Sequence, residues 1–202
     1  MNSMLSTPIE HIIPEVSNLE IALDDAKFIK LILDYLKNNN PIIHEFQYLI
    51  SPEFEKDKSL KEELAKPGVY IFDILLPKTL IISDWLKKQW ENHVENLCCT
   101  PGKNIGHIKT LLDRNKNSDY ICLYLGKSET NIFKRIKDHI TMKPNSQTYG
   151  LKLRHRKIDN NLIFRIRWFT LDKKKLNNKE KLLLFILEYL LHDELKPLLG
   201  SK

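Results

Sequence analysis

The chain has 202 residues, with 42% hydrophobic residues, 29% charged residues and a formal net charge of +6. This composition supports a folded core, and it excludes a membrane-spanning protein because no apolar run approaches the ~20 residues that a spanning helix needs. Its three cysteines make a poor disulfide framework, and no Cys/His spacing resembles a zinc site. We therefore expect a protein without a secretory signal or membrane segment, located in the reducing cytoplasm.

The positive charge is concentrated in one part of the chain. Residues 1–66 carry 7 Lys and Arg against 12 Asp and Glu, whereas residues 103–175 carry 18 against 6. Clustered positive charge favours contact with nucleic acid, whose backbone is a row of phosphates. A lysine-rich solvated surface has the same composition, so charge alone leaves both interpretations open.

The first 66 residues read as a separate acidic segment that is mainly helical. The clearest helix is predicted over residues 19–37, and the polar run 38–41 would end it. Residues 42–50 fit a strand or a short helix, because their periodicity does not decide. Lys66-Pro67 predicts a boundary, since a residue before proline avoids helical backbone. The segment could position a partner or simply pack against the basic part.

Two apolar strands follow, separated by an insertion. The first covers residues 68–76, and the second, over residues 119–125, ends at Gly126. Between them, residues 78–118 predict a helical insertion, with helices over 84–99 and 105–112. The helix after the second strand, over 131–140, would place Arg135 and His139 on one face because they are four residues apart. Ser128 is expected to cap this helix.

The remainder of the chain predicts one strand and one long helix. Residues 162–169 alternate well enough for a strand that carries Arg165 and Arg167 on one face. A final helix is predicted over 178–193, with Leu182, Phe185, Ile186, Tyr189 and Leu190 as its core residues. Together the elements predict an α+β fold, with a small mixed or antiparallel sheet flanked by helices and a second domain over 67–202.

The ordered set of motifs resembles the GIY-YIG nuclease superfamily. Gly68-Val69-Tyr70 and Tyr124-Leu125-Gly126 are similar to its paired strand signatures. Arg135 and His139 match the Arg and His of the helix that follows the second signature, although Lys134 competes with Arg135 because the spacing is one residue longer than usual. Glu188, with Leu191 and Pro197 after it, matches the later helix of restriction-type members. The resemblance covers residues 68–197.

The resemblance implies how these residues would cleave a phosphodiester. Tyr70 would act as general base or orient the attacking water, and Tyr124 would hold that water or a phosphate oxygen. Lys127 would lower the pKa of Tyr70 and bind phosphate. Arg135 would hold the scissile phosphate through its fork of donors, and His139 would assist proton transfer or bind phosphate.

The metal and the DNA contacts complete the expected site. Glu188 would hold one Mg²⁺, or Mn²⁺ in its place, with Glu180 as the competing ligand. Arg154, Arg156, Arg165 and Arg167 are candidates for contact with the DNA backbone, and they would equally suit a solvated basic face. Gly200 stands where many members have an Asn, and the long insertion separates strands that a short hairpin usually joins.

The expected function is therefore a metal-dependent DNA endonuclease, most simply a type II restriction enzyme. Such an enzyme would cut double-stranded DNA at a specific sequence, and reading a palindrome would favour a homodimer. Two alternatives remain open from the sequence. One is a repair or structure-specific nuclease, and the other is a nucleic-acid-binding module whose nuclease site is inactive.

Overall fold

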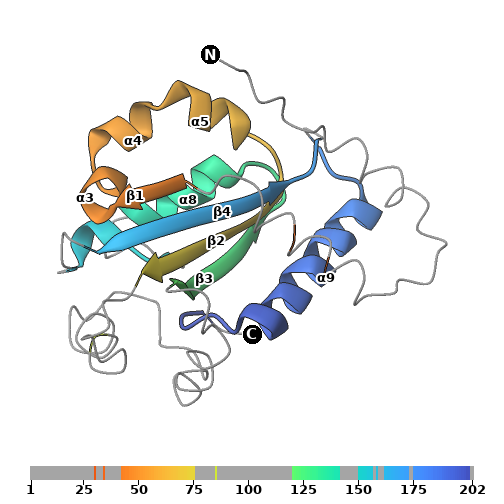
Figure 1. Cartoon of the computed structure of the whole chain (residues 1–202). Helices are drawn as coiled ribbons and strands as arrows, with labels where there is room; N and C mark the ends of the chain where they lie inside the picture. Colours follow the sequence, from red (N-terminus) through yellow and green to blue (C-terminus); the bar gives the residue numbers. More distant parts are fainter. Residues whose placement is uncertain are drawn as a thin grey trace.

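The computed structural model describes residues 42–75, 120–141, 150–156, 162–172 and 175–200, together with residues 30, 34, 85 and 158. Its centre is an antiparallel sheet of four strands in the order β1-β4-β2-β3 (Figure 1). The strands are β1 (Ile42–Glu45), β2 (Gly68–Leu75), β3 (Tyr120–Ser128) and β4 (Ile163–Thr170). Because helices flank this small sheet, the predicted α+β class is confirmed.

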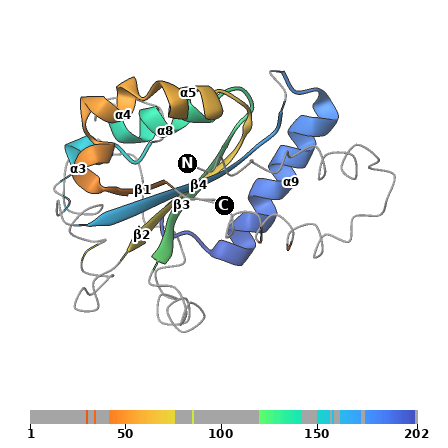
Figure 2. The ribbon, with the colours of Figure 1, turned by 45° about the horizontal axis from the view of Figure 1, so that its top comes forward.

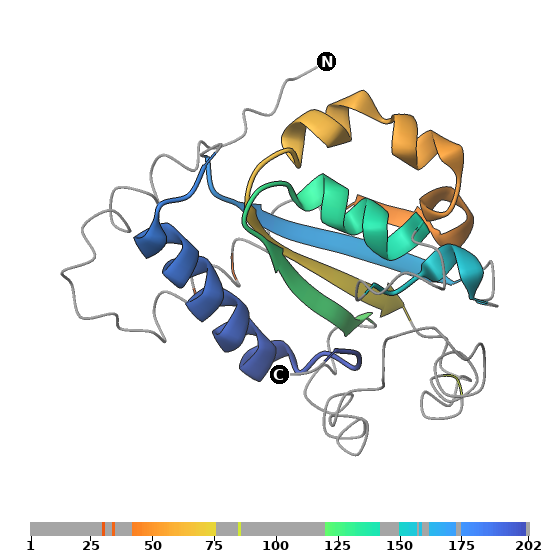
Figure 3. The same cartoon turned by 180° about the vertical axis from the view of Figure 1, so that it is seen from behind.

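Helices cover both faces of the sheet. One layer contains α3 (Phe46–Leu49), α4 (Pro52–Lys56), α5 (Lys58–Glu63) and α8 (Ile132–Thr141), and the other contains α9 (Asn178–Leu195). Figures 2 and 3 show the sheet between these two layers. A short 3-10 turn, η4 (Leu153–His155), contacts α8. In the part of the chain described, no helix is long and apolar enough to cross a membrane.

Strand β2 is central because its side chains feed a core on each face. Tyr70 and Phe72 point into the core shared with α8, whereas Val69 and Ile71 point into the core shared with α9. All four are fully buried, which explains why this strand reads as a continuous apolar run. Burial of each such side chain contributes about 1.5–3 kcal/mol to folding.

Residues 42–66 pack as part of this same unit. Strand β1 pairs with β4, and Phe54 of α4 stacks on Phe133 of α8 with their ring centroids 5.8 Å apart. Glu55 also forms ion pairs with Lys137 at 2.8 Å and with Arg154 at 2.9 Å. These contacts agree with the alternative in which this segment packs against the basic part of the chain, and the boundary at residue 66 stays a prediction. Residues 42–50, which the periodicity left open, form a strand followed by a helix.

The connection between β2 and β3 begins and ends at paired residues. Leu75 lies opposite Tyr120, so the predicted insertion occupies the tip of an antiparallel hairpin. The helices predicted over 19–37, 84–99 and 105–112 lie outside the described residues, apart from single positions. One of these positions, Trp85, is buried in the core that also contains Tyr70. The sheet therefore holds the two signature strands side by side despite the long sequence between them.

Helix α9 faces the sheet with different residues from those predicted. Leu184, Leu187 and Leu191 are buried, whereas Leu182 and two aromatic residues of the predicted core are more than half exposed. The predicted phase was wrong because residues 182–191 are apolar on nearly every side of the helix, so the 3.6-residue period gives no unique contact face. Strand β4 and the extent of α9 agree with the prediction, with α9 ending two residues later.

Candidate active site

The sheet places Tyr70 and Tyr124 on one face, beneath α8. Tyr70 lies opposite Gly126, and Phe72 lies opposite Tyr124, so both tyrosines extend from the same side of the β2–β3 pair. Their ring centroids are 6.3 Å apart and their planes differ by 30°. Tyr70 is fully buried, whereas Tyr124 is half-buried. The pairing of two strands thus accounts for the meeting of the two signature tyrosines.

Gly126 is required by the position of the Tyr70 ring. A Cβ atom at residue 126 would lie 2.6 Å from the Tyr70 Oη atom and 2.8 Å from its Cζ atom. These distances are shorter than any van der Waals contact, so the phenol crosses β3 where a side chain is missing. The glycine of the second signature therefore makes room for the tyrosine of the first.

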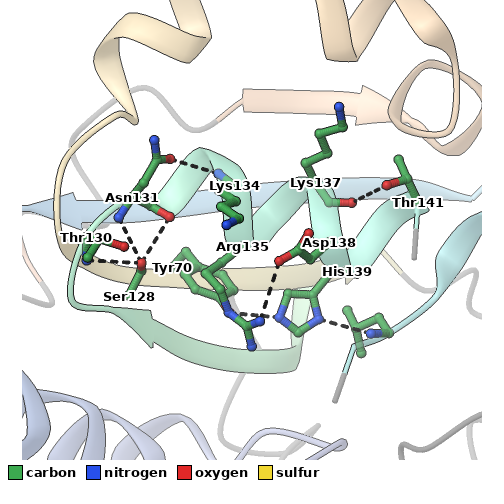
Figure 4. A network of polar contacts seen from close by, with 11 residues as sticks. Tyr70, Ser128, Thr130, Asn131, Lys134, Arg135, Lys137, Asp138, His139 and Thr141 are labelled. Atoms are coloured by element: carbon green, nitrogen blue, oxygen red, sulfur yellow. Dashed lines mark hydrogen bonds and ion pairs between the residues drawn. The ribbon is translucent and has the colours of Figure 1, made fainter. Parts of the chain in front are cut away.

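His139 fixes the Tyr70 hydroxyl from above, as Figure 4 shows. Its Nε2 atom lies 2.7 Å from Tyr70 Oη, and its Nδ1 atom accepts a hydrogen bond from the Leu151 backbone N–H at 3.0 Å. An Nδ1 atom that accepts a hydrogen bond carries no proton, so in the neutral ring the proton is on Nε2. His139 consequently donates to Tyr70, and the phenol oxygen is the acceptor.

Burial keeps this histidine neutral. Desolvation, followed by the positive charge of Arg135, lowers the pKa of His139 to about 3. Protonation would also place a hydrogen on Nδ1 and break its bond with Leu151. The arrangement therefore makes His139 a fixed hydrogen-bond donor, which differs from the expected role in accepting or delivering protons.

Arg135 approaches the same hydroxyl from one turn earlier on α8. It is half-buried, its guanidinium group lies 3.6 Å from Asp138, and its positive charge favours the ionised form of Tyr70. Burial raises the pKa of Tyr70, and the charges of Tyr124 and Glu188 act in the same direction. Together they outweigh the effect of Arg135, so the pKa lies well above its usual value. Tyr70 is therefore a neutral phenol in this state of the protein.

Glu188 reaches the site from α9, on the other side of β3. Burial raises the pKa of the Glu188 carboxyl, although Lys127 acts in the opposite direction. Among the described strands, β3 is at the edge of the sheet. The charge of Glu188 also contributes to the raised pKa of Tyr70.

Lys127, near the end of β3, contacts α9 through its side chain. Its ammonium group lies 3.4 Å from Glu129 and 5.7 Å from the centre of the Phe185 ring. In the described residues, His, Cys, Asp and Glu side chains do not gather in threes that would form a ready metal cage. A single carboxylate is nevertheless sufficient for Mg²⁺, which keeps several of its waters.

The sequence left two choices open, one between Lys134 and Arg135 and one between Glu180 and Glu188. In each pair the geometry favours the second residue. Lys134 is exposed at the start of α8, whereas Arg135 reaches Tyr70. Glu180 closes a capping box at the start of α9, where its carboxylate accepts from the Asn177 N–H at 2.8 Å. The structure thus brings Arg135 and Glu188, and not their rivals, toward the tyrosines.

The four other arginines have partners within the protein. Arg154 donates to Glu55 and to the Ile50 carbonyl, and the buried Arg156 donates to the Leu151 carbonyl at 2.6 Å. Arg165 and Arg167 both bind one carboxylate, described next. Contact between these arginines and DNA remains a prediction. Each contact would use the guanidinium N–H donors that do not take part in the internal hydrogen bonds.

Asp73 is a buried residue that the sequence analysis did not single out. It is 1% exposed and accepts two hydrogen bonds from Arg167, at 2.7 and 2.9 Å, and one from Arg165 at 2.7 Å. An Asp within an apolar strand could have signalled this cluster, because a buried carboxylate needs a charged partner. The sequence does not specify that this partner comes from the arginines of β4, because the pairing depends on how the strands lie in the sheet.

Two local features near α8 were also missed. Asn131 caps this helix by accepting from the Lys134 N–H at 2.8 Å, while Ser128 holds the preceding turn by accepting from the Asn131 N–H at 3.0 Å. Asn131 precedes the first apolar residue of the helix, which is the usual position of a cap. The role of the Leu151 N–H has no sequence signal, because any residue except proline supplies one.

Comparison of the chain with protein-family models, with curated proteins and with solved structures finds no match.

Proposed function

We propose that the chain is a metal-dependent endonuclease of the GIY-YIG type that hydrolyses phosphodiester bonds in double-stranded DNA. The observation that carries this proposal is the meeting of Tyr70, Arg135 and His139 at one hydroxyl, with Glu188 directed to the same edge of the sheet. These are a phenol, a guanidinium and a carboxylate, the groups that orient a water, neutralise a phosphate and hold a cation.

Arg135 and Lys127 provide the positive charge for the phosphate. The guanidinium has five N–H donors, more than its contacts with Tyr70 and Asp138 use. Two of these donors can bind adjacent oxygens of one phosphate in the bidentate geometry that favours arginine over lysine. Lys127 lies at the edge of β3 beside Glu188, so its ammonium group supplies a second, less directional cation.

Tyr70 is the residue that positions the attacking water. The Tyr70 oxygen accepts a hydrogen bond from His139. This bond limits the directions in which the Tyr70 O–H can point. Transfer of a proton from water to the phenol oxygen first requires a phenolate, and the donors His139 and Arg135 both stabilise that form. Tyr124, whose ring centroid lies 4.5 Å from that of His139, is the second tyrosine of the proposed site.

Glu188 fits the role of ligand for Mg²⁺. Its carboxylate is half-buried, and its raised pKa comes from burial that the charge of Lys127 does not fully offset. A bound Mg²⁺ would supply that charge and would favour ionisation of a nearby water. The finer proposal is a restriction-type enzyme that cuts a specific sequence, with a homodimer as the assembly that reads a palindrome.

The test is cleavage of several plasmids in Mg²⁺, followed by mapping of the cut ends. Discrete fragments are expected for a restriction-type enzyme, whereas cutting confined to branched DNA would support a structure-specific nuclease. Glu188→Gln and Arg135→Ala should each reduce cleavage at least ~100-fold, in the range of losses for electrostatic catalytic groups.

Matched controls come from the two competing residues, Glu180 and Lys134. Glu180→Gln and Lys134→Ala change the same types of charge on the same two helices, outside the site, and should retain cleavage. Should the Glu188 and Arg135 variants cut as fast as the wild type, or should the wild type bind DNA without cutting it in any metal, the endonuclease proposal is wrong.

A further inference from the structure

An apolar stripe on α9 lies exposed beside Glu188. In the part of the chain that the structure describes, the large hydrophobic side chains exposed to water are Leu182, Phe185 and Tyr189, at 59%, 55% and 54%. Spacings of three and four residues place them on one face of the helix. Exposed apolar side chains that are scattered singly need no explanation, but contiguous ones indicate an interaction surface.

This stripe adjoins the proposed catalytic groups through Lys127. The Lys127 ammonium group lies over the Phe185 ring, and its charge also opposes the raised pKa of Glu188. Glu188 is also the residue directly before Tyr189 and is three residues after Phe185, which is less than one turn of helix, or ~5 Å along its axis. A DNA strand held at Glu188 and Lys127 therefore passes next to two exposed aromatic rings.

The size of the stripe favours a base over a second copy of the chain. An aromatic side chain presents ~150–250 Å² in all, so three side chains exposed by little more than half offer on the order of 300 Å². A stable protein interface needs ~800 Å² on each partner. A single nucleobase, in contrast, needs only one ring face, and stacking on it is worth ~1–3 kcal/mol.

We infer that Phe185 and Tyr189 form a stacking surface for a base that leaves the duplex next to the cleaved phosphate. This inference rests on the proposed function. Apolar side chains that enter a duplex partly unstack one base step and kink the DNA, at a cost of a few kcal/mol that the new contacts offset. A mismatched step has already lost part of its stacking, so it lowers this cost.

The test compares the dissociation constants of two labelled duplexes in EDTA, where cleavage does not interfere. Both contain the sequence cut in the plasmid experiment, and one has a mismatch at the step beside the cut. The wild type should bind the mismatched duplex at least ~5-fold more tightly, corresponding to ~1 kcal/mol at 1.4 kcal/mol per factor of ten. Phe185→Ala and Tyr189→Ala should lose that preference, whereas Phe185→Tyr and Tyr189→Phe, which keep a ring, should retain it.

Leu182→Ala is the matched control, because it removes apolar surface from the same stripe without removing a ring. It should keep the preference, and all variants should keep the wild-type melting temperature within a few degrees because the positions are exposed. Equal binding of both duplexes by the wild type overturns the stacking surface, and so does an unchanged preference in the Ala variants. If the wild type still cleaves DNA, the endonuclease proposal stands in either case. Dissociation of a wild-type dimer by Phe185→Ala would instead identify a contact between copies, and absence of any DNA binding overturns both proposals.

Discussion

Two buried polar clusters occupy opposite faces of β2, only three residues apart. On the α9 face, Asp73 is surrounded by three hydrogen bonds from two arginines. Burial alone would lower the pKa of Arg167, but the Asp73 charge and hydrogen bonds outweigh it and raise that pKa. On the α8 face, Tyr70 is held by neutral and cationic donors and remains an un-ionised phenol. The Asp73 carboxylate is charged and bound by two guanidinium groups, which leaves that cluster with a net positive charge, whereas the Tyr70 phenol is uncharged.

The difference separates a structural role from a functional one. A buried carboxylate that is matched by two guanidinium groups holds β2 and β4 in register and leaves little for a ligand to add. At the centre of the Tyr70 cluster is an un-ionised phenol, and its half-buried Arg135 has more N–H donors than its contact with Asp138 uses. Burial of polar groups therefore identifies both clusters, and they differ in whether the central side chain carries a charge that its partners already bind.

The largest expected effect is on stability and comes from breaking the Asp73 cluster. Asp73→Ala leaves the Arg167 charge buried without its partner and should lower the free energy of unfolding by about 3–5 kcal/mol, as measured by urea denaturation. Asp172→Ala is the control, because its ion pair with Lys66 at 2.7 Å is exposed and should contribute under about 1 kcal/mol. Similar losses in the two variants would contradict a structural role for Asp73.

The second effect is on catalysis and comes from the Tyr70 cluster. Tyr70→Phe keeps the buried ring but removes the oxygen that His139 and Arg135 bind, so cleavage should fall ~100- to 1,000-fold, or about 2.7–4 kcal/mol in barrier. The rate is measured in Mg²⁺ with DNA in excess. Tyr48→Phe, a tyrosine that bonds weakly to Asp57 at 3.5 Å far from the site, should cut normally. Retention of the wild-type rate by Tyr70→Phe would remove Tyr70 from the mechanism.

The third effect tests whether the position of the Tyr70 ring matters. Gly126→Ala places a methyl group against the phenol, so the ring must move, at a cost of about 1–3 kcal/mol in stability and at least ~10-fold in cleavage rate. Gly200→Ala is the matched control. Its Cβ would make an ordinary contact of 3.4 Å with Tyr124, but the φ of +98° strains it by about 1–2 kcal/mol. Equal loss of activity in both variants would indicate general destabilisation instead of ring displacement.

The smallest effect is the dependence of stability on pH that His139 causes. The unfolded chain protonates this imidazole near pH 6.5, whereas the folded protein does not until pH about 3, so stability is lost as the pH falls through this interval. Between pH 7.5 and 5.5 the loss should be about 1.4 kcal/mol. His139→Asn should lack this contribution. Glu188 has the opposite pH dependence because its pKa is raised: its contribution to stability is present at low pH and is lost as the pH rises through its folded pKa.

Nitrogen-15 NMR of the His139 ring gives an independent check on the same residue. At pH 7 the spectrum should show a protonated Nε2 and an unprotonated Nδ1, because the Leu151 N–H occupies the latter. A proton on Nδ1, or a ring that becomes charged near pH 6, would contradict the assigned tautomer and return His139 to a role in proton transfer.

Much of the local structure could be predicted from the chain itself. The apolar runs around Val69 and Ile121 predicted β2 and β3, and the 3.6-residue spacing of Ile132, Phe133, Ile136 and Ile140 predicted α8 with its buried face. These signals are local, since the residues that carry them are neighbours in sequence. The spacing of Arg135 and His139 was equally local, and the helix does place them on adjacent turns.

Three features depended on tertiary contacts. They are the face of α9 that is buried, the packing of residues 42–66 against the core and the pairing of Asp73 with arginines. A leucine-rich helix has no unique apolar face, and a carboxylate in a strand does not specify which distant arginine will reach it. The sequence by itself determined which residues could form strands, helices and a phosphate-binding set. Only the folded chain decided that His139 donates to Tyr70, because that requires a backbone N–H from Leu151, twelve residues away, to occupy the other ring nitrogen.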